Sequence, residues 1–254
     1  MSALRPPPLD LLRDRRGLAV LIDPASTEAT DAAALAAAAA AAGAAALLVG
    51  GSYGVEARVA EVARAMKQGA PALPLLQFPA TAAQLVGDVD AVLLLSLVSG
   101  RNPQYLIEEH VRAVGFFAAH PGVAPLSTAY LLVDSGSVTS VEAVSQTRPL
   151  PADKPELVAA HVSAAMLIGM RAVYLDAGSG ARVPVSPSLI RAARGATDGL
   201  LFVGGGIRTA DGVREARAAG ADYVVVGTQF EQRGRGLGTP PSMRELVHAA
   251  RLSP

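Results

Sequence analysis

Short apolar runs of strand length alternate along the chain with longer segments of helical pattern. Each apolar run is continuous, as expected for a strand covered on both faces of a parallel sheet. Eight strands are predicted, at Leu18–Ile22, Ala46–Val49, Leu73–Phe78, Ala91–Leu97, Thr128–Val133, Ala172–Leu175, Leu200–Val203 and Tyr223–Val226. Helices are predicted at Thr27–Ala42, Val55–Gln68, Pro103–His120, Lys154–Gly169, Ser186–Arg194, Thr209–Ala219 and Ser242–Leu252. This alternation over 254 residues predicts a (β/α)8 TIM barrel, with residues 1–254 as a single domain.

One βα connection is shorter than the others. Only residues 79–90 separate the third and fourth predicted strands, and Pro79 and Gly87 leave space for no more than a turn or two of helix. The barrel is therefore expected to have a modified, shortened third βα connection. Either this is simply a short connection, or it opens a groove in the outer wall in which a long apolar ligand can lie.

Glycines follow the last two predicted strands. Gly204–Gly206 come after the seventh, and Gly227 with Thr228 after the eighth. Glycine lets backbone N–H groups approach an anion closely, and the next helix N-terminus favours negative charge. Phosphate sites of such barrels are built from these two loops. The sequence predicts a phosphate site here, the alternative being that the glycines only form tight turns.

The sixth predicted strand leads into Tyr174, Asp176 and a Gly-Ser-Gly segment at 178–180. Tyr174 and Asp176 are two residues apart, so both side chains point to the same side of the strand. The Gly-Ser-Gly segment can form a nest of backbone donors, with the Ser179 hydroxyl as a further phosphate donor. A carboxylate repels phosphate, so Asp176 suits the hydroxyl groups of the same ligand. The pattern suggests a small polyol phosphate, unless Asp176 only caps a turn.

Three further residues are candidates for binding charged groups. Asp23 ends the first strand and is followed by Pro24. It is either a metal ligand, a catalytic acid–base group or part of an Asp-Pro turn. Ser52 follows the second strand as an oxygen ligand or a helix N-cap. Together they would suit Mg²⁺, which keeps waters and shares its shell with substrate phosphates. Arg101 is either a diphosphate contact or a surface arginine.

Composition excludes several classes of protein. With 22 Lys+Arg and 22 Asp+Glu, no basic excess exists for general nucleic-acid binding. The absence of cysteine excludes disulfides, thiol nucleophiles and cysteine-bound zinc.

All four histidines fall in helical segments and are expected to be structural or solvated. The most apolar stretch, residues 32–50, is mostly alanine and is not expected to span a membrane. A cytoplasmic location and a homo-oligomer are expected.

Taken together, the motifs resemble the geranylgeranylglyceryl phosphate synthase family, in its bacterial type. They are Leu-Ile-Asp-Pro at 21–24, Gly-Gly-Ser at 50–52, Ser-Gly-Arg-Asn-Pro at 99–103, Tyr-Leu-Asp-Ala-Gly-Ser-Gly at 174–180, Gly-Gly-Gly-Ile-Arg at 204–208 and Gly-Thr at 227–228. The resemblance implies a Mg²⁺-dependent prenyltransferase of ether phospholipid biosynthesis. Such an enzyme joins the 3-hydroxyl of sn-glycerol 1-phosphate to geranylgeranyl diphosphate and releases diphosphate.

The resemblance also implies residue roles. Asp23 and Ser52 would hold the metal. Beside the resemblance, the residues themselves lead us to expect that Tyr174 and Asp176 are catalytic, with Asp176 accepting the hydroxyl proton, and that Arg101 contacts the diphosphate. Glycerol 1-phosphate would be bound by Tyr174, Leu175, Asp176, Ala177, Gly178, Ser179, Gly180, Gly205, Gly206, Gly227 and Thr228. The prenyl tail would use the modified third connection. Two departures are that the family often has Glu at the position of Asp176, and a Lys near the first-strand motif.

Other functions stay open at this point. One is a related prenyltransferase with a different chain length or a different acceptor, such as 3-phosphoglycerate. Another is a phosphosugar isomerase, aldolase or lyase, although the only lysines, Lys67 and Lys154, fall in helical segments or at a helix start, which argues against a Schiff-base aldolase. The last is a non-catalytic barrel that binds a phosphate ligand.

Overall fold

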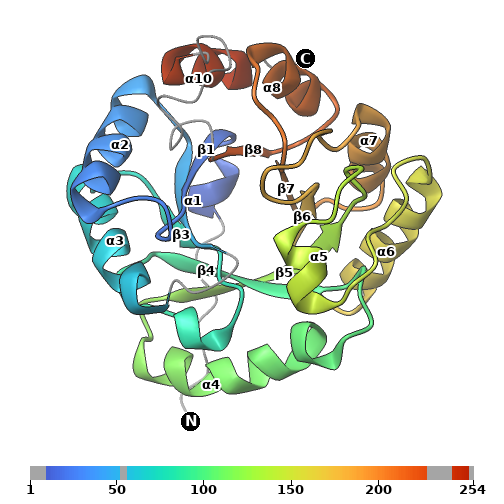
Figure 1. The fold of residues 1–254 in the computed structure, drawn as a ribbon, viewed down its shortest axis with the longest axis horizontal. Helices are drawn as coiled ribbons and strands as arrows, with labels where there is room; N and C mark the ends of the chain where they lie inside the picture. Colours follow the sequence, from blue (N-terminus) through green and yellow to red (C-terminus); the bar gives the residue numbers. More distant parts are fainter. Residues whose placement is uncertain (1–9, 52–55, 228–241, 252–254) are drawn as a thin grey trace.

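Eight parallel strands close into a barrel in the computed structural model, which describes residues 10–51, 56–227 and 242–251 (Figure 1). They are β1 (Gly17–Ile22), β2 (Ala46–Val49), β3 (Leu75–Gln77), β4 (Ala91–Leu97), β5 (Ala124–Leu132), β6 (Ala172–Asp176), β7 (Leu200–Gly204) and β8 (Tyr223–Val226). Each strand pairs with its neighbours in the chain, and β8 pairs with β1 to close the barrel. The predicted TIM barrel and all eight predicted strands are confirmed.

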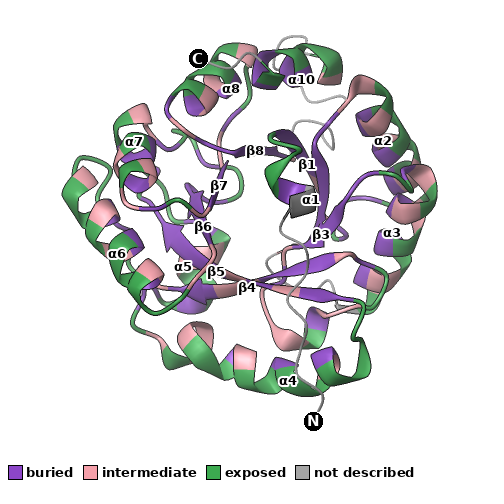
Figure 2. Ribbon diagram, turned by 180° about the vertical axis from the view of Figure 1, so that it is seen from behind, coloured by how far each residue is buried: buried purple, intermediate pink, exposed green. Residues whose placement is uncertain are grey.

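Helices form the outer ring around the strands (Figure 1). They are α2 (Ala29–Ala42), α3 (Glu56–Gly69), α4 (Glu109–Ala119), α6 (Pro155–Leu167), α7 (Pro187–Gly195), α8 (Ala210–Ala218) and α10 (Met243–Arg251). Figure 2 shows the strands buried and the outward faces of the helices exposed. No helix in the described ranges is long and apolar enough to cross a membrane.

Two short helices were not predicted from the sequence. Helix α1 (Asp10–Arg13) lies at the end of the barrel where the strands begin, and Leu12 packs with the barrel interior. The Tyr223 hydroxyl donates a 2.6 Å hydrogen bond to the Leu12 carbonyl. Helix α5 (Ser140–Ser145) begins where the Thr139 hydroxyl accepts a hydrogen bond from the Glu142 N–H. Neither helix has enough residues to show a periodic apolar pattern.

Strand β5 begins at Ala124, four residues before its predicted start. Pro125 and Ser127 interrupt the apolar run, so the pattern alone does not reveal this segment. Pairing with β4 extends the strand, because Ala124 lies opposite Ala91 and the register continues to Tyr130 opposite Leu97.

The third connection is short, as predicted, and its only helical segment is the 3₁₀ turn η1 (Ala82–Gln84). Side chains brace it in place of a helix: buried Gln77 donates from Nε2 to the Gln84 carbonyl (2.5 Å) and accepts from the Val86 N–H. Strand β3 pairs with β4 only through Leu76–Ala91 and Gln77–Val92. The carboxyl half of β4 therefore lies outside the described β3 pairing, and the barrel wall is open there.

A row of aromatic side chains fills the barrel interior. Tyr130, Tyr174, Phe202 and Tyr223 are register neighbours on β5, β6, β7 and β8. The Phe202 and Tyr223 rings stack with centroids 4.8 Å apart, and Phe78 lies 4.8 Å from Tyr174 at the carboxyl end. Half of the protein's ten Phe and Tyr residues lie in this one cluster. The interior is thus a packed core that supports the strand ends.

Candidate active site

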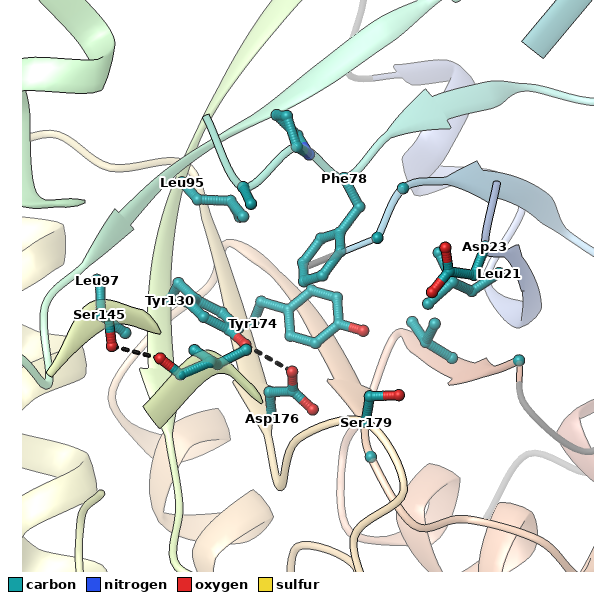
Figure 3. Close-up of a pocket in the computed structure, with 18 of the residues that line it drawn as sticks. Leu21, Asp23, Phe78, Leu95, Leu97, Tyr130, Ser145, Tyr174, Asp176 and Ser179 are labelled. Atoms are coloured by element: carbon teal, nitrogen blue, oxygen red, sulfur yellow. Dashed lines mark hydrogen bonds between the residues drawn. The ribbon is translucent and has the colours of Figure 1, made fainter. Parts of the chain in front are cut away.

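A cavity of about 1440 Å³, counting its open mouth, lies at the carboxyl ends of the strands (Figure 3). Its central part is lined by residues that follow β1, β2, β6, β7 and β8. A second part extends outward over η1 to α4, through the opening in the wall beside β4. One cavity therefore joins a polar centre to an apolar arm.

Asp176 is held in the centre by two hydrogen bonds. The Tyr130 hydroxyl donates to Asp176 Oδ2 at 2.6 Å, and the Gly178 N–H donates to Oδ1 at 2.8 Å. Each of the two Asp176 oxygens accepts a hydrogen bond, which is the arrangement expected of an ionised carboxylate. Because Tyr130 lies on β5 and Asp176 on β6, the barrel closure fixes both partners.

Burial dominates the electrostatics of this pair. Burial raises the pKa of Asp176, against the hydrogen bonds from Tyr130 and Gly178, which stabilise the anion and lower it. Burial and the neighbouring carboxylate raise the pKa of Tyr130 well above its ordinary value, and likewise that of Tyr174. The hydroxyl groups of Tyr130 and Tyr174 therefore stay protonated at neutral pH. Burial also makes the Asp176 carboxylate a stronger base than an exposed aspartate.

Two of the predicted glycines leave room for this arrangement. A Cβ on Gly204 would lie 2.4 Å from the Tyr174 hydroxyl oxygen. Gly205 has φ +81°, and its Cβ would lie 2.7 Å from both Asp176 Oδ1 and the Gly178 nitrogen. Backbone of the β7 loop thus approaches the β6 loop at a distance that only glycine permits.

Asp23 lies across the cavity from Asp176 (Figure 3). The Ala25 N–H donates to its Oδ1 at 2.8 Å, which orients the carboxylate, and burial raises its pKa. Within the described residues no group of three or more His, Asp or Glu side chains could hold a metal ion. Asp23 therefore suits a cation that takes its other ligands from water or substrate.

Of the arginines Arg101 and Arg208, the structure places Arg208 at the loops that follow β6 and β7. Arg208 lines the cavity and donates to the Ala181 carbonyl (2.7 Å), which ties the β7 loop to the β6 loop. Arg101 donates to the carbonyls of Val98 and Gly100, and it does not line the cavity. The diphosphate role predicted for Arg101 has no support from this position and stays a prediction.

The apolar arm is lined by side chains from both faces of β4 and from the third connection. Leu95 and Leu97 face the barrel interior, whereas Leu94 packs on its outer side. Leu85 of the third connection and Ala113 of α4 also line the arm. Two polar residues of α4 also line the cavity: Glu109 accepts from the Ala82 N–H, and His110 Nε2 donates to the Leu95 carbonyl at 2.8 Å.

Most of the predicted site residues come together in this cavity. Its lining includes Asp23, Tyr174, Asp176, Ser179, Gly180, Gly205, Gly206 and Gly227. Leu175 and Ala177 instead pack in the core between strands and helices, and Gly178 takes part through its N–H. Ser52 and Thr228 lie outside the described residues.

Sequence reasoning missed Phe78, Tyr130, Glu109 and His110. Phe78 directly follows β3, and Tyr130 lies near the carboxyl end of β5. Residues of barrel sites are found at these strand ends, so this position could have singled them out. Nothing in the helical pattern around Glu109 and His110 distinguishes them from solvent-exposed helical residues. They line the cavity because no full helix follows β3 to separate α4 from it.

The fold and this site define a (β/α)8 barrel whose strand ends carry glycine-rich loops, an acidic centre and an apolar arm, which is where enzymes of this fold have their active sites. Sequence comparison is more specific: the profile of the PcrB family matches residues 10–240, and the chain belongs to this family.

Relatives of known name support the same assignment. The geranylgeranylglyceryl phosphate synthase of Spirosoma linguale is 40% identical over 229 residues, covering 88% of this chain and 91% of the relative. That of Korarchaeum cryptofilum is 37% identical, covering 92% and 95%. The crystal structure of (S)-3-O-geranylgeranylglyceryl phosphate synthase from Thermoplasma acidophilum with sn-glycerol-1-phosphate has a TM-score of 0.85 at 28% identity, covering 95% and 96%. The resemblance drawn from the motifs is confirmed.

Proposed function

We propose that this protein joins the 3-hydroxyl of sn-glycerol 1-phosphate to a C20 prenyl diphosphate, forming an ether and releasing diphosphate. The observation that carries the proposal is the single cavity, in which an apolar arm opens beside the phosphate loops and the two carboxylates. The relatives are named for this type of synthesis, and one was crystallised with glycerol 1-phosphate.

Glycerol 1-phosphate would lie between β6 and β8. The Gly205, Gly206 and Gly227 loops and the Ser179 hydroxyl would bind its phosphate, with the charge of Arg208 nearby. Asp176 would then accept a hydrogen bond from the 3-hydroxyl and take its proton as the new C–O bond forms. Tyr174 lies between Asp176 and Asp23 in the cavity and would border the reacting atoms (Figure 3).

The prenyl diphosphate would place its tail in the apolar arm. Each buried CH₂ of such a tail contributes about 0.8 kcal/mol of binding. Its allylic carbon gains cationic character as the bond to diphosphate lengthens. Phe78 and Tyr174, whose ring centroids are 4.8 Å apart, line the cavity, and their aromatic rings would stabilise that charge by cation–π interaction.

Asp23 would hold Mg²⁺ together with the diphosphate. The oriented carboxylate, which within the described residues belongs to no group of three or more His, Asp or Glu side chains, fits a metal that keeps waters and substrate oxygens as ligands. Ser52, the second predicted ligand, is part of this proposal. When bound, Mg²⁺ supplies Lewis-acid stabilisation of the charge that develops on the departing diphosphate.

Purified protein with Mg²⁺, glycerol 1-phosphate and labelled geranylgeranyl diphosphate should form a butanol-extractable product, which phosphatase converts to the prenylglycerol. Absence of product with every donor from farnesyl to heptaprenyl diphosphate would favour the non-catalytic barrel. A faster reaction with 3-phosphoglycerate would favour a different acceptor. A cytoplasmic location, a single domain and a homo-oligomer complete the proposal, and sedimentation would test the last.

A further inference from the structure

The Tyr130–Asp176 pair presents hydrogen-bond acceptors to the cavity and no donor of its own. A phenol has a single proton, and that of Tyr130 is directed to Asp176 Oδ2, 2.6 Å away. The other Asp176 oxygen accepts from the Gly178 N–H. Both side chains line the cavity. A ligand that meets this pair must therefore bring its own donors.

Two adjacent hydroxyl groups are the ligand that complements such a pair. The oxygens of Tyr130 and Asp176 lie side by side at about the separation of the two oxygens in a vicinal diol. We infer that Tyr130 is a specificity-determining residue: its oxygen accepts from the 2-hydroxyl of the acceptor while Asp176 accepts from the 3-hydroxyl. The site would thus select a phosphorylated vicinal diol. This inference rests on the proposed function, since it assumes that glycerol phosphate binds here.

The same pair would reject a carboxylate in place of the terminal hydroxyl. Among the described residues that line the cavity, the basic side chains are Arg208 and His110. Arg208 is engaged at the phosphate loops, and His110 on α4 donates to the Leu95 carbonyl. Neither is bonded to Asp176, so a ligand carboxylate would face an anion and a second acceptor. Phosphoglycerate is therefore disfavoured as the acceptor.

Packing holds the Tyr130 oxygen in place independently of any ligand. Its ring contacts Tyr174 (centroids 5.7 Å apart) and Phe78 (5.8 Å), and the residue is 5% exposed. Tyr130→Phe removes the oxygen and keeps these ring contacts. Tyr223→Phe is a matched control, because it removes a buried hydroxyl of the same aromatic row whose partner is Leu12, outside the cavity lining.

Calorimetric binding of three ligands to these proteins tests the inference without requiring turnover. The ligands are glycerol 1-phosphate, 3-hydroxypropyl phosphate, which lacks the 2-hydroxyl, and 3-phosphoglycerate. In the unmodified protein, loss of the 2-hydroxyl should weaken binding about 10-fold, and 3-phosphoglycerate should bind roughly 100-fold more weakly than glycerol 1-phosphate. In Tyr130→Phe the first ratio should fall to about twofold or less, whereas Tyr223→Phe should keep the original ratio.

An unchanged ratio in Tyr130→Phe would overturn the inference, because a purely structural tyrosine weakens both ligands equally. Equal binding of the two alcohols, or tight binding of 3-phosphoglycerate, by the unmodified protein would also overturn it. Failure of the unmodified protein to bind any of the ligands would instead count against the proposed function itself. Tyr130→Met, which also lacks the hydroxyl, replaces Tyr130→Phe should that variant fail to fold.

Discussion

Glu109 on α4 accepts a 2.7 Å hydrogen bond from the backbone N–H of Ala82, the first residue of η1. The same carboxylate accepts from Gln104 Nε2 (3.0 Å) and from Arg112 (2.6 Å). This nearly buried carboxylate therefore joins the short third connection to the helix on the other side of the apolar arm. We expect the width of the arm to depend on this contact.

Glu109→Ala should lower the free energy of unfolding by about 1–3 kcal/mol, because three donors lose a charged acceptor. The KM for prenyl diphosphate should rise, and that for glycerol 1-phosphate should stay unchanged. Chemical denaturation and steady-state kinetics measure both effects. Glu108→Ala is the control, since Glu108 is exposed and pairs with Arg112 only at 3.6 Å, so a change within about 0.5 kcal/mol is expected. Equal rises in both KM values would contradict the assignment of the arm to the tail.

Leu94→Trp should shorten the donor that the enzyme accepts. Leu94 lines the arm on the outer side of β4, where a larger side chain would occupy the space of the distal tail. The kcat/KM for geranylgeranyl diphosphate should fall by about tenfold or more relative to that for a shorter donor, from the lost burial of several CH₂ groups. Equal loss for both donors would mean that the tail does not reach Leu94.

Gly205→Ala should weaken glycerol 1-phosphate binding by about tenfold or more, because its Cβ would press on Asp176 and the Gly178 nitrogen. Gly136→Ala separates this effect from backbone strain. Gly136 has φ +76°, and nothing lies within 4 Å of its added Cβ, so only the left-handed conformation is penalised, by about 1–2 kcal/mol of stability. Titration calorimetry should show affinity preserved in Gly136→Ala. A similar loss of affinity in both variants would argue against the phosphate site at Gly205.

Asp23→Asn should lower kcat by about 100-fold or more and leave the melting temperature nearly unchanged. The amide keeps the shape of the carboxylate and can accept from the Ala25 N–H, but it carries no charge for a metal. Diphosphate binding should lose its Mg²⁺ dependence in parallel. Full activity of Asp23→Asn would remove the metal assignment.

The acid limb of kcat/KM should lie above the ordinary pKa of an aspartate. Asp176 must be ionised to accept a proton, and burial raises its pKa, so activity is lost as pH falls through this raised value. Tyr130→Phe should move the limb to still higher pH, because the Tyr130 hydrogen bond stabilises the anion. A pH–rate series on both proteins measures the shift, with Tyr223→Phe as the control. A shift to lower pH would show that another group controls this limb.

Local pattern was enough to predict the barrel and much of its polar centre. Buried parallel strands are continuous apolar runs, and the carboxyl ends of the strands converge at one face of a barrel. Asp23, Asp176 and Gly205 each follow or end such a run, so their position in the chain alone places them at the same face. The shortage of residues between 79 and 90 likewise predicted the missing third helix.

Register and packing decided the rest. Tyr130 meets Asp176 because β5 and β6 pair with Leu132 opposite Asp176, a relation between residues 46 positions apart that no local pattern encodes. Arg208 rather than Arg101 lines the cavity because the loop after β7 folds back on the loop after β6. The local order of apolar and polar residues determines which helices and strands form, because the periodicity that distinguishes them extends over only a few residues. Only the closed barrel determines which side chains touch, because those contacts depend on strands that meet across the whole chain.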